Sequence, residues 1–211
     1  MSDTKRAWKR VSAKVIRWLH LYASMFSFFV VFFFSITGIT LNHPTWFGTA
    51  EEHVAESHGQ LNTSWLGTAA NESSENAANE VQKLEIVEFL RGEHQVRGAV
   101  SEFAIDESQC IVAFRAPGYT ADAFIDRATG NFDLVQSSFG FVAVINDLHK
   151  GRDSGKGWGV LIDVSAVILI FVSVTGLLLI FYINRHRNAG LITALAGTVA
   201  TVAIYYWLVP R

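Results

Sequence analysis

Four of the seven histidines stand where they could bind a redox cofactor. His20 and His43 lie near the two ends of the first long apolar segment, and His149 and His186 lie on either side of the second. The stretch from His20 to His43 would cover about 34 Å of α-helix, close to the thickness of a bilayer. A bis-histidine haem site needs one neutral imidazole from each of two facing helices. The spacing therefore predicts an inner pair, His20 and His186, and an outer pair, His43 and His149, as haem iron ligands.

A plainer interpretation of these histidines stays open. Histidine is tolerated at helix ends because its polar tip reaches the headgroups, and His186 lies in the basic run Arg185-His186-Arg187. His20 is the strongest single candidate, since it lies within the apolar segment, where polar groups are costly and usually functional. A c-type haem is excluded because the chain has no Cys-x-x-Cys-His. The expected cofactor is therefore haem b.

Asp163 is the one charged residue in the second apolar segment. It could accept a hydrogen bond from His149 or His43 and so orient a ligand. It could equally be an acid in the first turn of a helix, favoured there by the helix dipole and reached by water.

The histidines belong to a weak internal repeat. Leu19-His20 is followed by Thr37-Gly38, and Leu148-His149 is followed by Thr175-Gly176. Such repeats can mark paired halves of membrane proteins. The Thr-Gly steps would let helices pack closely, or they would leave room for a flat cofactor.

The helices that must position these residues are membrane spans. Half of the 211 residues are apolar and only 17% are charged, whereas a soluble domain carries about a quarter. Residues 18–42, 158–183 and 189–209 are each long and apolar enough to cross a bilayer. A net charge of −2 speaks against nucleic-acid binding, and the single cysteine, Cys110, excludes an intrachain disulfide and a thiolate metal cluster.

The distribution of charge predicts the orientation. Residues 1–17 carry six basic side chains against one acid, and the short link 184–188 adds two more basic ones. Residues 43–157 carry 17 acidic against 8 basic residues. By the positive-inside rule, the N-terminus is expected to be cytoplasmic and the C-terminus periplasmic.

The segment between the first two spans predicts a small α+β module. Residues 59–80 are polar and small, which is typical of a flexible linker. From Val81 apolar residues recur at helical spacing, and alternating runs separated by turn residues follow up to residue 140. His53 and His58 are expected to lie in a solvated acidic loop rather than in a metal site.

The sequence resembles the PepSY-associated transmembrane helix family of bacterial inner-membrane proteins. The resemblance rests on Arg17-Trp18-Leu19-His20, on Asp147-Leu148-His149-Lys150-Gly151, and on the strand-and-turn run 123–130, which is similar to the end of a PepSY domain. The resemblance implies that the module at 81–140 is a PepSY-like domain, so that the expected fold has three membrane helices with this periplasmic domain between the first and second. It also implies location in the inner membrane. Larger relatives include reductases of ferric siderophores that bind haem through histidines on their spans, but this chain has fewer spans and no second outer domain.

Two functions follow as expectations. The first is a haem-binding electron-transfer protein, a component that reduces ferric chelates on the periplasmic side. Its electrons would come from a donor such as quinol, because the chain has no nicotinamide or flavin fingerprint. The second is a non-catalytic accessory protein whose PepSY-like module binds a periplasmic partner, as other PepSY proteins act on partners without a redox cofactor.

Overall fold

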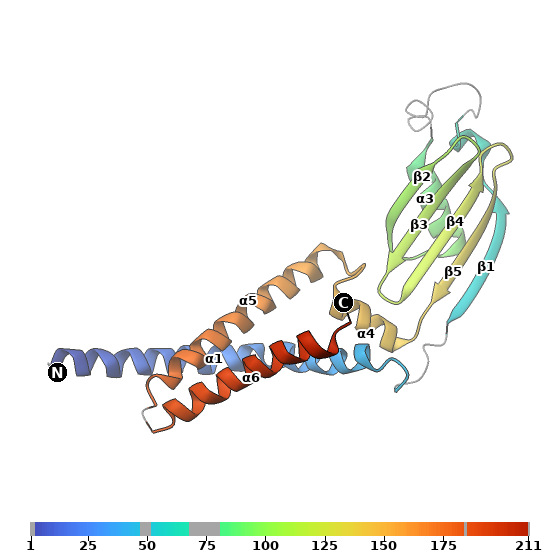
Figure 1. The fold of residues 1–211 in the computed structure, drawn as a ribbon. Coiled ribbons are helices and arrows are strands. Elements are labelled where there is room, and N and C mark those ends of the chain that lie inside the picture. Colours follow the sequence, from blue (N-terminus) through green and yellow to red (C-terminus); the bar gives the residue numbers. More distant parts are fainter. Residues whose placement is uncertain (1–2, 47–51, 68–80, 184, 211) are drawn as a thin grey trace. The chain divides into compact units, whose positions relative to one another are not determined.

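The structure, a computed structural model, describes residues 3–46, 52–67, 81–183 and 185–210 (Figure 1). The chain divides into two compact units, of which one comprises residues 1–32 and 161–211 and the other residues 33–160. Two long helices, α1 (Asp3–Asn42) and α5 (Gly155–Ile180), contribute residues to both units. Each unit is described by itself below.

Three helices are long and apolar enough to cross a bilayer, which confirms the predicted fold class. They are α1, whose apolar part is Ala7–Asn42, α5, and α6 (Arg187–Leu208). No glycine or proline interrupts α1 before Gly38, and the helix ends just before His43, which precedes Pro44 and is therefore disfavoured in helical geometry.

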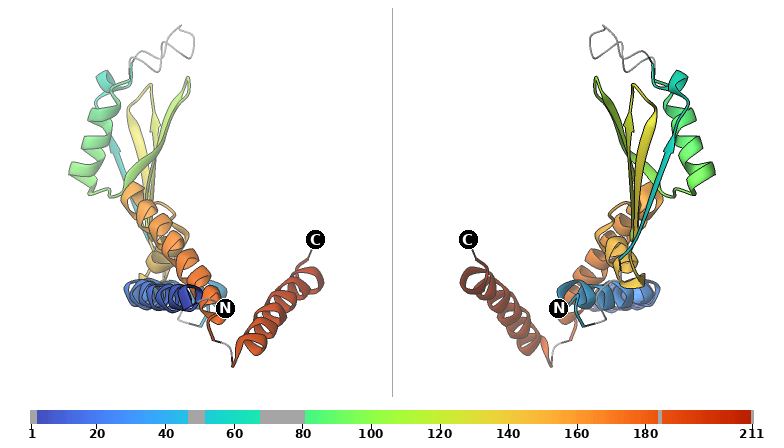
Figure 2. Two further views of the ribbon diagram at one scale, coloured as in Figure 1. Left: turned by 90° about the vertical axis from the view of Figure 1, so that its left-hand side faces the viewer. Right: turned by 90° about the vertical axis from the view of Figure 1, so that its right-hand side faces the viewer.

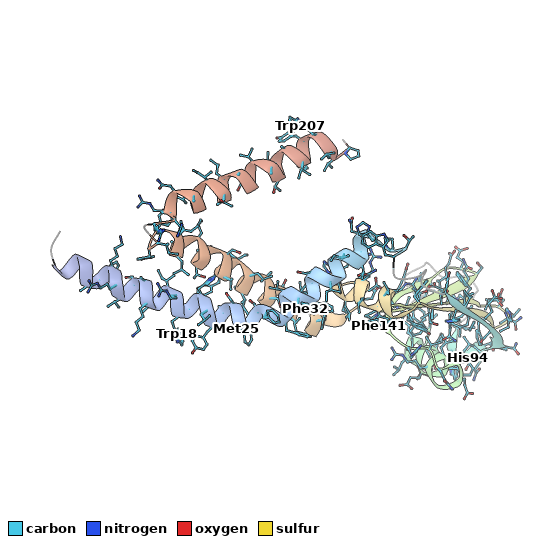
Figure 3. The ribbon with its side chains drawn as sticks, turned by 90° about the horizontal axis from the view of Figure 1, so that it is seen from below. Trp18, Met25, Phe32, His94, Phe141 and Trp207 are labelled. Carbon is cyan, nitrogen blue, oxygen red and sulfur yellow. The ribbon has the colours of Figure 1, made fainter. Side chains whose placement is uncertain are left out.

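Apolar side chains cover the outside of these helices, as expected for surfaces that face lipid. On α1, for example, Trp18 and Met25 are 57% and 64% exposed (Figure 3).

The second unit contains a five-stranded antiparallel sheet in the order β1-β5-β4-β3-β2. Four strands form a meander: β2 (Ala99–Ile105), β3 (Gln109–Ala116), β4 (Tyr119–Asp126) and β5 (Asn131–Ser138). One face of the sheet is covered by α3 (Lys83–His94) (Figure 2). The expected helix followed by antiparallel strands is thereby confirmed. The core between them holds Ile86, Val87, Leu90, Cys110, Val112, Phe114, Ala121, Ala123, Ile125, Phe132 and Leu134.

The sheet begins earlier than the predicted module at residue 81. β1 (His53–Gln60) pairs antiparallel with β5, and a 3-10 turn η1 (Thr63–Trp65) follows it. Leu61 and Leu66 are 3% and 0% exposed in the core, so the first residues of the predicted linker 59–80 are packed structure. The buried Arg127 fastens this segment, because its guanidinium donates from Nε and Nη2 to the Leu66 carbonyl. Residues 68–80 of that linker lie outside the described residues.

A further helix, α4 (Phe141–Lys150), stands between the sheet and α5. This helix is not among the elements predicted from the sequence. His149 lies in its last turn, so that this histidine is carried by a short helix of its own and not by a membrane span.

Candidate functional site

In the first unit, the ring of His20 lies against a Thr-Gly step of α5. Its Nδ1 is 3.0 Å from the hydroxyl of Thr175, a residue that is 5% exposed. A Cβ added to Gly176 would lie 3.2 Å from His20 Cε1, so the imidazole occupies the space that a side chain at this position would take. The ring itself is only partly buried.

In the second unit, His149 lies against the Thr-Gly step of α1 in the same way. Its Nδ1 is 2.6 Å from the hydroxyl of Thr37, which is 2% exposed. A Cβ at Gly38 would lie 3.7 Å from His149 Cε1. The ring of Phe34 contacts the imidazole edge to face, with centroids 5.0 Å apart. This histidine is also partly buried.

The surrounding hydrogen bonds favour one tautomer for both histidines. Each threonine hydroxyl has one proton to donate, and the backbone carbonyl four residues earlier accepts it: Phe33 for Thr37 at 2.8 Å and Phe171 for Thr175 at 2.9 Å. This bonding favours the tautomer in which the threonine oxygen accepts from the ring, Nδ1 carries the proton and Nε2 the lone pair. Within the described residues, neither ring has a second hydrogen-bond partner.

The two sites are reciprocal. The histidine of the first repeat meets the Thr-Gly step of the second, and the histidine of the second repeat meets the Thr-Gly step of the first. In each arrangement the glycine lets a partly buried imidazole lie against the helix, and Nε2 has no hydrogen-bond partner among the described residues. A neutral imidazole held through Nδ1–H is the form in which histidine binds a metal.

The other two predicted ligands have different surroundings. His43 follows the end of α1, where its ring stacks on Trp46 at 3.7 Å between centroids and its Nε2 accepts from Asn42 at 3.3 Å. His186 is exposed just before α6. In the described parts of the chain, no hydrogen bond or ring contact joins His20 to His186 or His43 to His149. Each predicted pair nevertheless falls within one unit.

Asp163 is exposed on α5, in the unit that contains His20. The polar group that holds His149 is Thr37, and the group beside His43 is Asn42. The hydrogen-bond partners of the two imidazoles, Thr175 and Thr37, are not among the predicted site residues. The Thr-Gly steps are visible in the repeat, but nothing in a linear sequence shows which histidine each step contacts.

The sheet module holds two titratable groups with a shifted pKa. Hydrogen bonds from the backbone N–H and then the hydroxyl of Thr129 hold the pKa of Asp126 below its ordinary value. Burial raises the pKa of the Cys110 thiol. His58 lies on β1, exposed, with Nδ1 2.6 Å from Asp133. Among the described residues, no three His, Cys, Asp or Glu side chains gather closely enough to hold a metal ion.

Comparison with known proteins identifies a family. A family model described as "Putative PepSY_TM-like" matches residues 14–210, nearly the whole chain. The match includes both histidines and both Thr-Gly steps. No curated protein and no solved structure matches the chain.

Proposed function

Since this chain belongs to the putative PepSY_TM-like family and is a multi-pass membrane protein, we propose that it binds haem b and transfers electrons within the membrane. The observation that supports this function is the duplicated site in which a threonine holds Nδ1–H and leaves Nε2 of His20 and His149 free. In this proposal, each of these two nitrogens is an axial ligand of a separate haem.

The donor set fits haem b. A hydrogen bond from Nδ1–H fixes the tautomer and the orientation of a ligating imidazole and raises its basicity. The glycine beside each ring, Gly176 or Gly38, lets the imidazole lie close to the helix backbone and so restricts its orientation. A neutral nitrogen donor in apolar surroundings is a common ligand of haem iron. When bound, the haem would supply one-electron chemistry, while the protein sets its potential through ligand, burial and hydrogen bonds.

His186 and His43 are the proposed second ligands, for the His20 site and the His149 site respectively. This assignment agrees with the division into units, because each pair lies within one of them. His43 would have to exchange its contact with Asn42 for the iron, since the same nitrogen, Nε2, makes that contact.

In the proposed direction of flow, electrons enter on the cytoplasmic side from a donor such as quinol and leave towards ferric chelates on the periplasmic side. The charge distribution supports this orientation, with basic residues in 1–17 and acidic ones in 43–157. The bacterial inner membrane is the compartment where such a donor and such an orientation occur together.

The test is an absorption spectrum of the detergent-purified chain, oxidised and then reduced with dithionite, with haem measured per chain. We expect a Soret band, sharp reduced α and β bands, and two haems per chain. His20→Ala and His149→Ala should each remove one haem, whereas His58→Ala, at an exposed histidine of the sheet module, should remove none. Reoxidation of the reduced protein by a ferric chelate then tests the acceptor.

A colourless protein from haem-replete cells would refute the proposal. The chain would then be an accessory protein anchored in the membrane, and the search would turn to a periplasmic partner of its sheet module.

A further inference from the structure

Four consecutive residues of α4, Asn146 to His149, contact three different parts of the second unit. Asn146 and His149 contact α1, Asp147 contacts the turn between β3 and β4, and the Leu148 carbonyl contacts α5. Successive side chains of a helix point about 100° apart. This turn of α4 is therefore held from several sides, and the histidine lies at its end.

The contact with the sheet is made by Asp147. Its carboxylate accepts a hydrogen bond from the backbone N–H of Gly118 at 2.9 Å. Gly118 has a φ of +66°, and a Cβ there would lie 2.5 Å from Val144 Cγ2. Only glycine combines this backbone geometry with so close an approach to the helix. The β3–β4 turn and α4 are thus packed directly against each other.

The contacts on the membrane side fix the same turn of α4. Asn146 pairs with the hydroxyl of Thr40 at 2.6 Å, and Thr40 is 3% exposed. The indole Nε1 of Trp158 donates to the Leu148 carbonyl at 2.7 Å. His149 then completes the set through Thr37. A shift of the sheet turn against α4 would consequently move the segment that carries the imidazole.

We propose that Asp147 is a positioning residue through which the sheet module sets the orientation of the His149 imidazole. This inference rests on the proposed function in one respect, namely that Nε2 of His149 is a ligand. The geometry of Asp147 itself does not depend on the ligand. A partner or ligand that displaces the β3–β4 turn would alter the His149 site through this contact, and the accessible module would thereby control electron transfer at that site.

The first measurement needs no haem. Diethyl pyrocarbonate modifies unprotonated imidazole nitrogens, and mass spectrometry resolves His149 from His20 in the full-length protein in detergent. In Asp147→Ala we expect the modification rate of His149 to rise several-fold, because the turn of α4 that carries the imidazole loses its contact with the sheet. The rate at His20 should not change. Asp147→Asn keeps an oxygen that can accept from Gly118 and should restore the rate.

Glu107→Ala is the matched control, since it removes an exposed carboxylate from the same module at a β2–β3 turn. If Asp147→Ala does not accumulate, Asp147→Ser, whose side chain is one bond shorter than that of Asp, replaces it with the same expectation. Equal changes at both histidines, or no change at either, would overturn the role of Asp147.

The second measurement uses the haem-loaded protein. Electron paramagnetic resonance should show an altered signal for the haem at His149 in Asp147→Ala and an unaltered one for the haem at His20. The two failures are distinguishable. A chain that binds no haem refutes the proposed function and leaves the labelling experiment to decide about Asp147. A haem-loaded chain in which the labelling rate and the signal of the variant match the wild type refutes the role of Asp147 alone.

Discussion

The two glycines beside the histidines predict opposite results for the same substitution. In Gly38→Ala, the new Cβ would lie 3.7 Å from His149 Cε1, which is an ordinary van der Waals contact. In Gly176→Ala, it would lie 3.2 Å from His20 Cε1, with the other ring atoms Nδ1 and Nε2 at 3.8 and 4.0 Å. The His149 site has room for the methyl group of alanine, whereas at the His20 site the imidazole must move.

Two effects set the expected changes in the free energy of unfolding. Both substitutions gain helix propensity, about 1 kcal/mol in favour of alanine over glycine inside a helix. Gly176→Ala also overpacks the contact, which typically costs about 1–3 kcal/mol. To restore a normal carbon–carbon distance, the His20 ring must shift by roughly 0.4 Å. Its hydrogen bond to Thr175, now 3.0 Å, would stretch towards the limit for such a bond.

We therefore expect Gly38→Ala to raise the free energy of unfolding by about 0.5–1 kcal/mol. The free energy of unfolding of Gly176→Ala should be about 1–3 kcal/mol lower than that of Gly38→Ala. The labelling rate of His20 should also increase several-fold in Gly176→Ala. The assay is unfolding of the detergent-solubilised protein in a titration with a denaturing detergent, followed by circular dichroism, with histidine labelling in parallel. Equal stability of the two variants together with unchanged labelling of His20 would refute the reasoning.

Three further predictions concern single groups. Thr37→Val keeps the shape but removes the acceptor of the His149 Nδ1–H; it should destabilise the protein by about 1–2 kcal/mol and change the spectrum of the haem at His149, as measured by unfolding and absorption. The Cys110 thiol, 0% exposed and with its pKa raised by burial, should react with maleimide only after the sheet unfolds, so labelling of the native protein would contradict the described core. Hydrogen bonds from Thr129 lower the pKa of Asp126 below its ordinary value of 3.8, so the contribution of this carboxylate to stability is present above pH 3.8 and is lost as the pH falls through the lowered pKa. Asp126→Asn should therefore flatten the dependence of the unfolding midpoint on pH below about 4. An unchanged slope would contradict this assignment.

The sequence predicts the elements whose pattern is local. Depletion of charge over long segments identifies the three spans, and alternation identifies β2 to β5, because each pattern is read within one segment. The alternation of apolar residues does not predict β1. Its residues are almost all exposed, so the strand has no apolar alternation, and it is held by backbone pairing with β5. The helical continuation of α1 back to Asp3 was likewise not predicted, since basic residues give no periodic apolar signal although they are good helix formers.

The candidate site is predicted in its parts but not in its pairing. The spacing of His20 and His149 in the chain, and the two Thr-Gly steps, are visible in the sequence. Which step meets which histidine depends on how distant helices pack, and the proton assignment depends on a carbonyl four residues before each threonine. The hydrogen bond from Gly118 to Asp147 cannot be predicted from the sequence either, because α4 and the β3–β4 turn come together only in the folded unit.

The reciprocal sites have a consequence for how the protein can be divided. Neither repeat contains a whole site, since each histidine uses the hydroxyl and the bare helix surface of the other repeat. The protein should therefore be separable into two complementary fragments. Two fragments, divided between the repeats and produced together, would each have to supply half of both sites, so any site formed would report that the fragments had assembled.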